Sequence, residues 1–472
     1  MDAVSVPDAR ISEEGNPSLA MDIARVASAV RYDDLPDAVQ EKARVHLLDT
    51  FGLALASLTQ PFAAPSIQGI IAAGAPGRCV VLGTGHRLSA RDAAMANGLL
   101  MHGLDFDDTH MASIIHASVA SLPAALSLGE HLDVSWKEML VAYVVGMEVA
   151  IRIGAAVKGG FHEVGFHATG VVSHFSSATV AGRLLGLTAS QICAAQGIAA
   201  STAAGVQVFL EEGAWTKRLH PGWGALSGIT AAYMAQAGFL GPSRPYEGKF
   251  GLFETHLHGA RASMDAISVG LGSEWRMLET AIKPYPICHF NHACVEASIR
   301  LSAQVRERLG EVEEIIAILP EPTLHIVAEP AFKKQRVTTD YEAKFSVQYG
   351  IAASLVRGKF GMQELSPESI LNPQFAALAA RVRCQPEEHT EFPKYFSGKV
   401  TVRFSNGDTL SEHIPVNLGA GSRPLSWDQV SSKFLGTAGL LLGAERSRAA
   451  LDIIGQAGDS SVREVLADLA AL

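Results

Sequence analysis

The spacing of apolar residues predicts helices over most of the first half of the chain. Between residues 19 and 241, apolar residues such as Ile23, Val26 and Val30 recur three or four positions apart, as on one face of a helix. Pro36 fits the first turn of a second helix, because the N–H that proline lacks is one that a helix leaves unused there. Short connectors separate these segments, so the pattern indicates a large all-α domain.

Local signals mark where several helices begin and end. A serine or threonine followed three residues later by an acid or an amide forms a capping box, which satisfies free backbone N–H groups. Three pairs fit this pattern: Ser89 with Asp92, Thr188 with Gln191, and Ser426 with Gln429. Gly238, with Pro242 shortly after it, predicts the end of a helix that begins near Trp223.

The pattern changes after about Trp275, where strands join the helices. Residues 399–404 alternate apolar and polar side chains, and Asn406-Gly407 is typical of the tight turn between two antiparallel strands. A return strand is therefore predicted up to Ile414. The other elements predicted in this part are an amphipathic helix over 292–309, a strand over 312–319 and an apolar helix over 345–356.

These patterns predict a mainly α protein, with a large all-α helical domain formed by both chain ends and a smaller α+β domain inserted between them. A chain of 472 residues is too long for one ordinary core. The last 45 or so residues make too thin a core to stand alone. The predicted segments are a flexible N-terminal tail over 1–17, the helical domain over 18–275, the α+β domain over 276–415, and C-terminal helices over 416–472 that rejoin the helical domain.

Composition limits the cellular compartment and the classes of partner that we expect. Hydrophobic residues make up 48% of the chain and charged residues 18%, as in globular proteins, and the formal net charge of −10 argues against nucleic-acid binding. The five cysteines are scattered and odd in number, which favours a reducing compartment. Residues 1–17 lack the apolar core of a signal peptide, and the longest apolar run, 139–147, is too short for a membrane span. We therefore expect a cytoplasmic protein with no membrane partner.

The most distinctive stretch is the acidic run over residues 104–109, at the end of an Ala-rich predicted helix. If the helix continued, Asp105, Asp108 and Thr109 would share a face, and carboxylates so close raise one another's pKa unless a cation or a donor lies between them. Acids at a helix C-terminus also oppose the helix dipole. The run therefore indicates either a functional site or a structural hydrogen-bonded cluster. The order Asp-Phe-Asp-Asp also occurs in all-α terpene cyclases, but this chain is only 7% aromatic and lacks their cavity lining.

Further residues suited to chemistry lie in four other segments, and each has an ordinary structural alternative. His167, in a Gly-bounded turn, could equally cap a helix. Lys217 and Arg218 could be solvated residues at a helix start, although a bound anion would offset their unfavourable place near the positive end of the dipole. Lys283 opens the second domain, and Tyr349 could be an ordinary core tyrosine.

One cluster near the start of the second domain invites a zinc interpretation. It contains Cys288, His289, His292 and Cys294. Their spacing is not that of a zinc finger, in which a second pair of ligands follows at a fixed distance. Two prolines and a helix start explain the local composition without a metal. We therefore predict no metal site there.

Taken together and in this order, the motifs resemble the MmgE/PrpD family, which includes 2-methylcitrate dehydratase, cis-aconitate decarboxylase and iminodisuccinate epimerase. The resemblance runs from about Leu19 to the C-terminus. It implies the two-domain layout predicted above, with the α+β domain as a lid, a homodimer, and no organic cofactor or metal. The motifs that carry it are Asn97-Gly98, residues 104–109, residues 165–170, residues 216–220 and residues 283–286.

The resemblance also implies a set of site residues and an activity. The residues implied as catalytic are His167, His116, Asp105 and Tyr349, and those implied as substrate-binding are Lys217, Lys283, Thr109 and His220. Two lysines suit the carboxylates of a di- or tricarboxylate, and a histidine suits removal of a proton next to a carboxylate. We expect a lyase that dehydrates a 2-methylcitrate-like polycarboxylate. Decarboxylation of a cis-aconitate-like substrate, epimerisation of an iminodicarboxylate and a non-catalytic polycarboxylate-binding role remain open alternatives.

Overall fold

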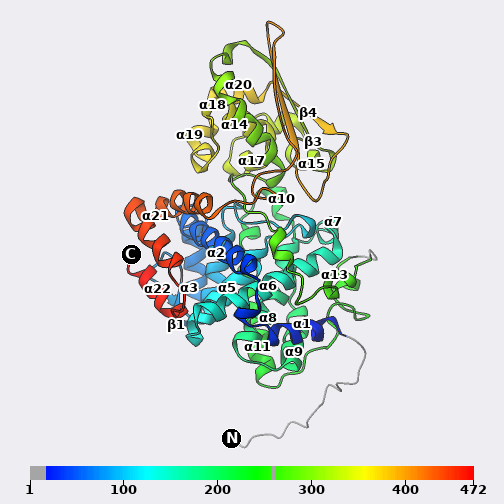
Figure 1. Ribbon diagram of the computed structural model, residues 1–472, viewed down its shortest axis with the longest axis vertical. Helices are drawn as coiled ribbons and strands as arrows, with labels where there is room; N and C mark the ends of the chain where they lie inside the picture. The colour runs from blue at the N-terminus through cyan, green and yellow to red at the C-terminus, as the bar shows by residue number, and fades with distance from the viewer. Residues whose placement is uncertain (1–17, 258–260) are drawn as a thin grey trace, which may run out of the picture.

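The computed structural model describes residues 18–257 and 261–472, which form a large helical part and a smaller α/β part stacked along the long axis (Figure 1). The expected N-terminal tail, residues 1–17, lies outside the described residues. We call these two parts the helical part and the α/β part. The helical part contains residues from both ends of the described chain.

The helical part is built mainly from long helices. Its first helices are α1 (Leu19–Ala29), α2 (Asp37–Ser57), α3 (Ala63–Ala73), α4 (Ala90–His102), α5 (Ala117–Leu132), α6 (Trp136–Val157), α8 (Ala168–Leu184), α9 (Ala189–Ala200) and α11 (Thr216–Gln236). Shorter elements between them are β1 (Pro76–Val80), β2 (Arg87–Leu88), α7 (Gly160–Glu163), α10 (Phe209–Glu212), α12 (Leu252–His256) and α13 (Asp265–Ser268). Single 3₁₀ turns span Tyr32–Asp34, Met111–Ser113 and Arg276–Glu279.

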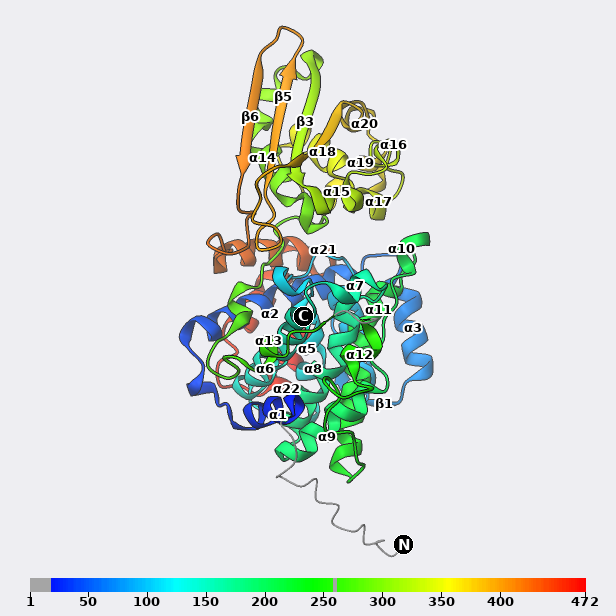
Figure 2. The ribbon, with the colours of Figure 1, turned by 90° about the vertical axis from the view of Figure 1, so that its right-hand side faces the viewer.

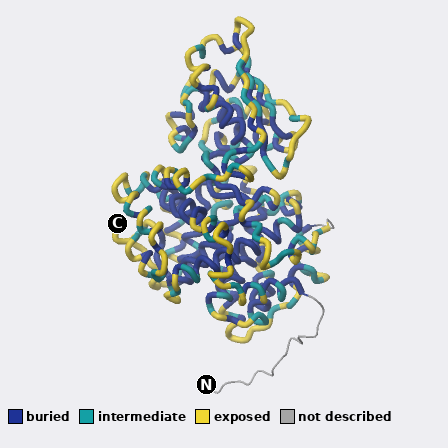
Figure 3. The backbone as a smooth tube through the Cα atoms, viewed as in Figure 1, coloured by how far each residue is buried: buried dark blue, intermediate teal, exposed yellow. Residues whose placement is uncertain are grey.

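Helices α5, α6 and α8 form the buried centre of this part (Figure 3). Among the described helices, α6 is long and apolar enough to cross a membrane by length and composition, but 94% of its most apolar window is buried inside the protein. A buried core helix passes the same test. The burial of α6 therefore accounts for its apolar sequence.

Glycines allow the helices that carry the site to approach one another closely. A Cβ atom at Gly98 of α4 would lie only 2.6 Å from the Cα atom of Gly222 in α11. A Cβ atom at Gly224 would lie 2.5 Å from the Cβ atom of Ser173 in α8. No side chain fits at such distances, so glycine is required for this packing. The contacts bring the C-terminal end of α4 beside the start of α11.

The C-terminal helices pack on the helical part. They are α21 (Trp427–Gly455), which is kinked at Gly443, and α22 (Val462–Ala470). Val430 and Phe434 of α21 share one hydrophobic core with α2, and a Cβ atom at Gly52 of α2 would lie 2.5 Å from Oγ1 of Thr437. Figure 1 shows α21 and α22 beside α2 and α3.

The α/β part is a four-stranded sheet covered by helices (Figure 2). The strand order is β4-β3-β5-β6; β3 pairs with β4 in parallel, and the other two pairs are antiparallel. Its strands are β3 (Val312–Pro320), β4 (Val382–Glu387), β5 (Gly398–Phe404) and β6 (Thr409–Ile414). Its helices are α14 (His292–Arg306), α15 (Glu321–Val327), α16 (Ala331–Lys334), α17 (Asp340–Lys344), α18 (Val347–Arg357), α19 (Pro367–Ile370) and α20 (Pro373–Ala379), with 3₁₀ turns at His289–Asn291, Leu309–Glu311 and Met362–Leu365.

The elements predicted from local patterns agree well with this structure. Ser89, Thr188 and Ser426 are all N-caps of helices, the full capping box forms at Thr188 and Ser426, and the hairpin at Asn406-Gly407 joins β5 to β6. The predicted start of a helix near Trp223 is wrong, because α11 begins seven residues earlier and contains Pro221. Its first two turns therefore hold the cationic segment that was expected to precede the helix.

Candidate active site

The acidic run forms a loop rather than the end of a helix. Helix α4 ends at His102, and Asp105 adopts a left-handed backbone conformation with φ of 53°. The prediction that Asp105, Asp108 and Thr109 share a helix face is therefore wrong. We call residues 103–109 the acidic loop. Its last residue, Thr109, exchanges two backbone hydrogen bonds with Ala281, of 2.8 and 2.9 Å, which hold the loop against the segment that leads to the α/β part.

Asp105 lies between two lysines that come from distant parts of the sequence. The Nζ atom of Lys217, in the first turn of α11, lies 2.8 Å from Oδ1 of Asp105. The Nζ atom of Lys283 lies 3.3 Å from the same oxygen and donates to the backbone carbonyl of Asp105 at 2.8 Å. Burial alone would raise the pKa of the Asp105 carboxyl, but the two ammonium groups hold it well below its ordinary value. Asp105 is therefore ionised and neutralises only one of two positive charges.

Asp107 has imidazole partners. Its Oδ2 atom lies 2.8 Å from Nδ1 of His102 and 3.4 Å from Nδ1 of His116. Burial raises the pKa of the Asp107 carboxyl, but the two imidazoles more than offset this and lower it to about 2. Asp107 therefore holds His102 in place at the end of α4.

Asp108 points into the helical part. Its carboxylate contacts Nδ1 of His46 in α2 at 2.6 Å and accepts hydrogen bonds from the backbone N–H of Ser118, at 3.1 Å, and from the Ser118 hydroxyl. That hydroxyl also contacts the hydroxyl of Tyr143 in α6 at 2.6 Å. Despite burial, which raises it, the pKa of Asp108 is lowered by these partners. Asp108 thus fixes the acidic loop to three helices of the core.

Three histidines, buried or nearly so, gather beside the loop. The ring centres of His102 and His116 are 4.8 Å apart, and those of His102 and His167 are 5.6 Å apart. His116 and His167 are the N-cap residues of α5 and α8. Burial, together with the nearby Lys217 ammonium, lowers the pKa of His116 to about 3 and that of His167 well below its ordinary value. Both imidazoles are therefore neutral near pH 7 and have a nitrogen that can accept a proton.

His220 packs against His167. Its Nδ1 atom is 2.9 Å from Nδ1 of His167, and burial lowers its pKa to about 4. It was expected to bind substrate, and that role stays a prediction. The contact with His167 follows from the early start of α11, because His220 is on the second helical turn and faces α8.

A small cavity lies where the two parts of the protein meet. It has a volume of about 10 Å³, room for about one water molecule. Lys344 of α17 reaches it from the α/β part and donates to the backbone carbonyl of Leu104 at 2.9 Å. Figure 2 shows α17 above the region of α10 and α11. The cavity is lined by His102, Gly103, Asp105, Ala214, Lys217, Arg218, Tyr341 and Lys344.

The structure brings most of the expected site residues together, but not all of them. Asp105 and Thr109 belong to the acidic loop, and beside it lie His116, His167, Lys217 and Lys283. Tyr349 is elsewhere, in the core of the α/β part, where its hydroxyl donates to the carbonyl of Glu364 at 2.5 Å and contacts no residue of the loop. The structure therefore agrees with the alternative of an ordinary core tyrosine, with the ring packed against Phe375 of α20, and a catalytic role for Tyr349 stays a prediction.

Four residues of the site were not predicted. His102 could have been found, since it immediately precedes the acidic run. Arg218 was noted only as a cation at a helix start, and it donates to the carbonyl of Gly103 at 2.7 Å. Tyr341 and Lys344 had no local signal, because they join the cavity only through the placement of α17 over the helical part.

Two groups of side chains near the loop have the spacing of metal ligands. They are His102 with His116 and His167, and Asp105 with Asp107 and His116, each with ligand atoms within 4.8 Å of one another. The ammonium groups of Lys217 and Lys283 compete with a cation for Asp105, so we assign no metal to this site. In the cysteine and histidine cluster at residues 288–294, Cys294 is buried in the hydrophobic core of the α/β part.

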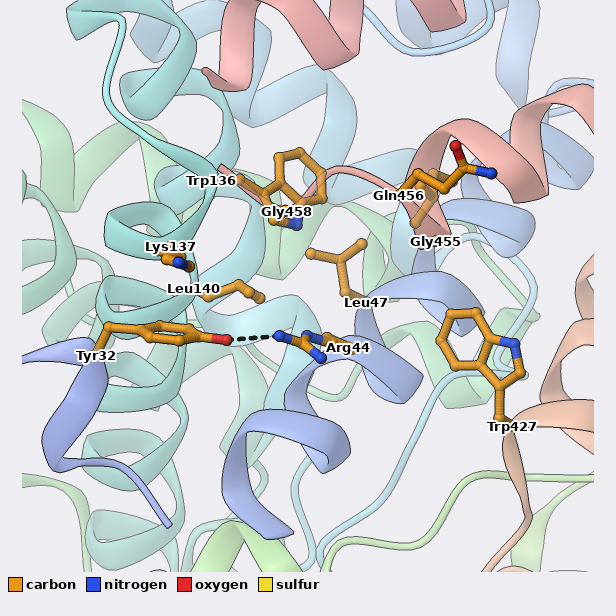
Figure 4. Close-up of a pocket in the computed structure, with 11 residues that line it drawn as sticks. Tyr32, Arg44, Leu47, Trp136, Lys137, Leu140, Trp427, Gly455, Gln456 and Gly458 are labelled. Atoms are coloured by element: carbon orange, nitrogen blue, oxygen red, sulfur yellow. Dashed lines mark hydrogen bonds between the residues drawn. The ribbon is translucent and has the colours of Figure 1, made fainter. Parts of the chain in front are cut away.

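A larger cavity of about 200 Å³ lies between α2, α6 and α21 (Figure 4). Its walls include Tyr32, Trp136 and Trp427, and Nη2 of Arg44 donates to the Tyr32 hydroxyl at 2.6 Å. It contains no histidine or carboxylate, so it lacks an acid–base pair. The candidate active site is therefore the smaller cavity at the acidic loop.

Comparisons with known proteins agree over nearly the whole chain. The MmgE/PrpD N-terminal domain matches residues 21–265, and the MmgE/PrpD C-terminal domain matches residues 285–456. Cis-aconitate decarboxylase of Aspergillus terreus is 26% identical over 92% of each chain. Cis-aconitate decarboxylase of Homo sapiens is 27% identical over 96% of this chain and 94% of its own. A more distant relative, 2-methylcitrate dehydratase of Salmonella typhimurium, is 22% identical over 82% of each chain.

Proposed function

The chain belongs to the MmgE/PrpD family, and from this membership and the geometry of its site we propose that it is a lyase that decarboxylates a cis-aconitate-like polycarboxylate without an organic cofactor. The observation that carries the proposal is the pair of lysines, Lys217 and Lys283, that share the single carboxylate of Asp105 beside neutral histidines. A polyanion that enters the site would supply the negative charge that this arrangement lacks.

Substrate carboxylates take the place of Asp105 at the two ammonium groups. Lys217 comes from the helical part and Lys283 from the segment that leads into the α/β part, so the two can hold different carboxylates of one molecule. Arg218 and Lys344 lie at the same cavity and add positive charge. Their donors now bind backbone carbonyls of the acidic loop, which fixes the loop while the substrate binds.

Entry of a substrate requires the two parts of the protein to separate. A cavity of about 10 Å³ has no room for a molecule with three carboxylates. The α/β part therefore acts as a lid that opens to admit the substrate and then closes. Closure excludes water and strengthens each interaction between a carboxylate and an ammonium group.

The reaction breaks the bond between a substrate carbon and one carboxylate, which leaves as CO2. The electron pair stays on the substrate as an enolate-like anion, and Lys217 and Lys283 stabilise its charge. The bound polyanion raises the pKa of His167, which then holds a proton and delivers it to the carbanion. His116, with Nε2 3.6 Å from Oδ1 of Asp105 and its ring centre 6.3 Å from that of His167, orients the substrate.

Dehydration of a 2-methylcitrate-like substrate is the second candidate. It uses the same residues, with a histidine removing the proton next to a carboxylate while hydroxide leaves. The decarboxylases match this chain at 25–27% identity over at least 92% of its length, whereas the dehydratases match at 22–23% over 81–82%. This difference favours decarboxylation over dehydration as the proposed reaction. The sequence motifs alone had favoured dehydration.

Product analysis tests the proposal. The purified protein is incubated separately with cis-aconitate, 2-methylcitrate, citrate and iminodisuccinate, and products are followed by NMR. Loss of CO2 from cis-aconitate is the expected result. Water loss from 2-methylcitrate alone would favour the dehydratase, and scrambled stereochemistry of iminodisuccinate would favour an epimerase. Binding of these acids without turnover would favour a non-catalytic role. The absence of both binding and turnover would contradict the proposal.

We further propose that the protein works in the cytoplasm as a homodimer, as the family resemblance implies. The large exposed apolar side chain of Trp223, on α11, is a candidate contact between subunits, since it is 47% exposed. Light scattering coupled to size exclusion should give twice the mass of one chain, 49.9 kDa. A mass of one chain would contradict the dimer, and a dimer that persists in Trp223→Glu would place the interface elsewhere.

A further inference from the structure

The contact between His167 and His220 requires a single proton between two nitrogens. Their Nδ1 atoms are 2.9 Å apart, which is the length of a hydrogen bond. A neutral imidazole carries its proton on one nitrogen and a lone pair on the other. One of the two residues therefore donates from Nδ1, and the other accepts at Nδ1.

The surrounding backbone holds His220 in this position. A Cβ atom at Gly170 would lie 3.2 Å from Cβ of His220, and a Cβ atom at Gly205 would lie 3.2 Å from its Nδ1. The Phe209 ring stands edge-on to both imidazoles, with ring centres 6.1 Å from His167 and 5.9 Å from His220. The backbone N–H of His167 donates to the carbonyl of Gly205 at 2.7 Å. Close contacts therefore hold both rings in these orientations.

We propose that His220 is a positioning residue whose Nδ1 accepts the Nδ1–H of His167, so that Nε2 of His167 exchanges the proton with the substrate. This inference rests on the proposed function, in which His167 gains and loses a proton. A histidine that accepts a proton at Nε2 must already carry one at Nδ1. If His220 donated instead, Nε2 of His167 would hold the proton already and could accept none.

The groups around His167 explain why its partner is an imidazole rather than a carboxylate. The titratable side chains that face it are His102 of α4, His116 of α5, His162 of α7, and Lys217 and His220 of α11. No carboxylate belongs to this set of described side chains. A neutral acceptor fixes the tautomer without adding the charge that would hold a proton on His167 in the empty site. His167 therefore becomes charged only when a polyanion has bound.

Two substitutions separate this role from a purely structural one. Asparagine at position 220 places an amide oxygen about where Nδ1 of histidine lies, so His220→Asn keeps the acceptor. His220→Leu keeps most of the volume and removes the acceptor. His325→Leu, at an exposed histidine of α15 in the α/β part, is the matched control. The tautomer of His167 is read from the 15N and 1H chemical shifts of its ring in 15N-labelled protein.

We expect the Nδ1–H tautomer of His167 in the wild type, in His220→Asn and in His325→Leu, and the Nε2–H tautomer in His220→Leu. With a substrate that is turned over, His220→Leu should lower kcat about 100-fold with KM nearly unchanged, and His220→Asn should restore most of the loss. The Nε2–H tautomer in the wild type, or no change in His220→Leu, would overturn the proposal, as would a raised KM with unchanged kcat. The tautomer is measured without substrate, so it decides this inference even if the proposed reaction fails.

Discussion

Asp105 and Asp108 lie three residues apart in one loop, yet their surroundings differ completely. Asp108 is closed in by His46 and Ser118, which belong to long core helices. Asp105 lies at the cavity, where its partners are the flexible ammonium groups of two lysines. The same side chain is thus part of the framework at one position and part of the site at the other.

The different roles of Asp105 and Asp108 follow from the residues that each carboxylate contacts. The backbone N–H and the hydroxyl of Ser118 are fixed donors that no ligand can remove without unfolding the loop. Lys217 and Lys283 carry long side chains that exchange one carboxylate for another at little cost. The acidic loop therefore has an anchored half at Asp108, held by the core helices. Its displaceable half is at Asp105, whose place at Lys217 and Lys283 a substrate carboxylate takes.

The largest expected effect is on activity, at the displaceable half. Lys217→Met and Lys283→Met should each lower kcat/KM about 1,000-fold, because each removes a charge that stabilises the reacting anion. The variant Lys359→Met, at an exposed lysine that donates a hydrogen bond to Gln363, is the control and should match the wild type. Steady-state kinetics with the substrate found by product analysis measure the effect. A loss below tenfold in both site variants would show that the lysines do not bind the substrate.

The next effect is on stability, at the anchored half. Asp108→Asn should lower the free energy of unfolding by about 3 kcal/mol, because it breaks a buried pair and leaves polar groups unsatisfied. Asp105→Asn should cost less than Asp108→Asn, since asparagine tolerates the left-handed backbone and the side chains of Asp105 and Lys217 are 13% and 15% exposed. Urea unfolding of both variants measures the contrast. Equal losses would show that the two carboxylates have the same role.

A smaller effect is the pH dependence of the free energy of unfolding. The histidines and the carboxylates contribute to it in different pH ranges. Buried His116 and His174 have pKa values of about 3 and about 4, whereas unfolded histidines bind a proton near 6.5. The unfolded state therefore binds more protons below pH 6.5, and stability falls as pH drops from 6.5 to about 4.

Each such histidine contributes up to about 1.4 kcal/mol per pH unit in that window. Asp105 and Asp108 have lowered pKa values and stay ionised there, so their own contribution is lost only at lower pH. Urea unfolding at several pH values measures the slope, and His174→Asn should make it shallower by one proton. A slope that first appears below pH 4 would contradict this account of the histidines.

Local features of the sequence predicted local structure well. The capping boxes at Ser89, Thr188 and Ser426 each need only four residues, and the hairpin at Asn406-Gly407 needs only a turn, so these elements could be read directly. Strand β4 was not predicted, because it is half exposed and contains Pro386 and so resembles a loop. It is defined by pairing with β3, which the local sequence does not encode.

The site could be predicted only where a motif carried it. Lys217, Lys283 and His167 were found by family resemblance, and the structure brings them to the acidic loop. Tyr341 and Lys344 could not be found, because they reach the cavity through the packing of the two parts of the chain. The helix face assigned to the carboxylates failed at Asp105, since its left-handed conformation turns the chain out of α4.

The smallest expected effect is also the most direct test of whether a substrate carboxylate replaces Asp105. Propane-1,2,3-tricarboxylate, an unreactive tricarboxylate, is titrated by calorimetry into the wild type, Asp105→Asn, and Lys217→Met. Binding to Asp105→Asn should be about tenfold tighter than to the wild type, because the competing carboxylate is gone and both lysines remain. Binding to Lys217→Met should be much weaker than to either. Equal affinity in all three proteins, or weaker binding to Asp105→Asn than to the wild type, would contradict the account.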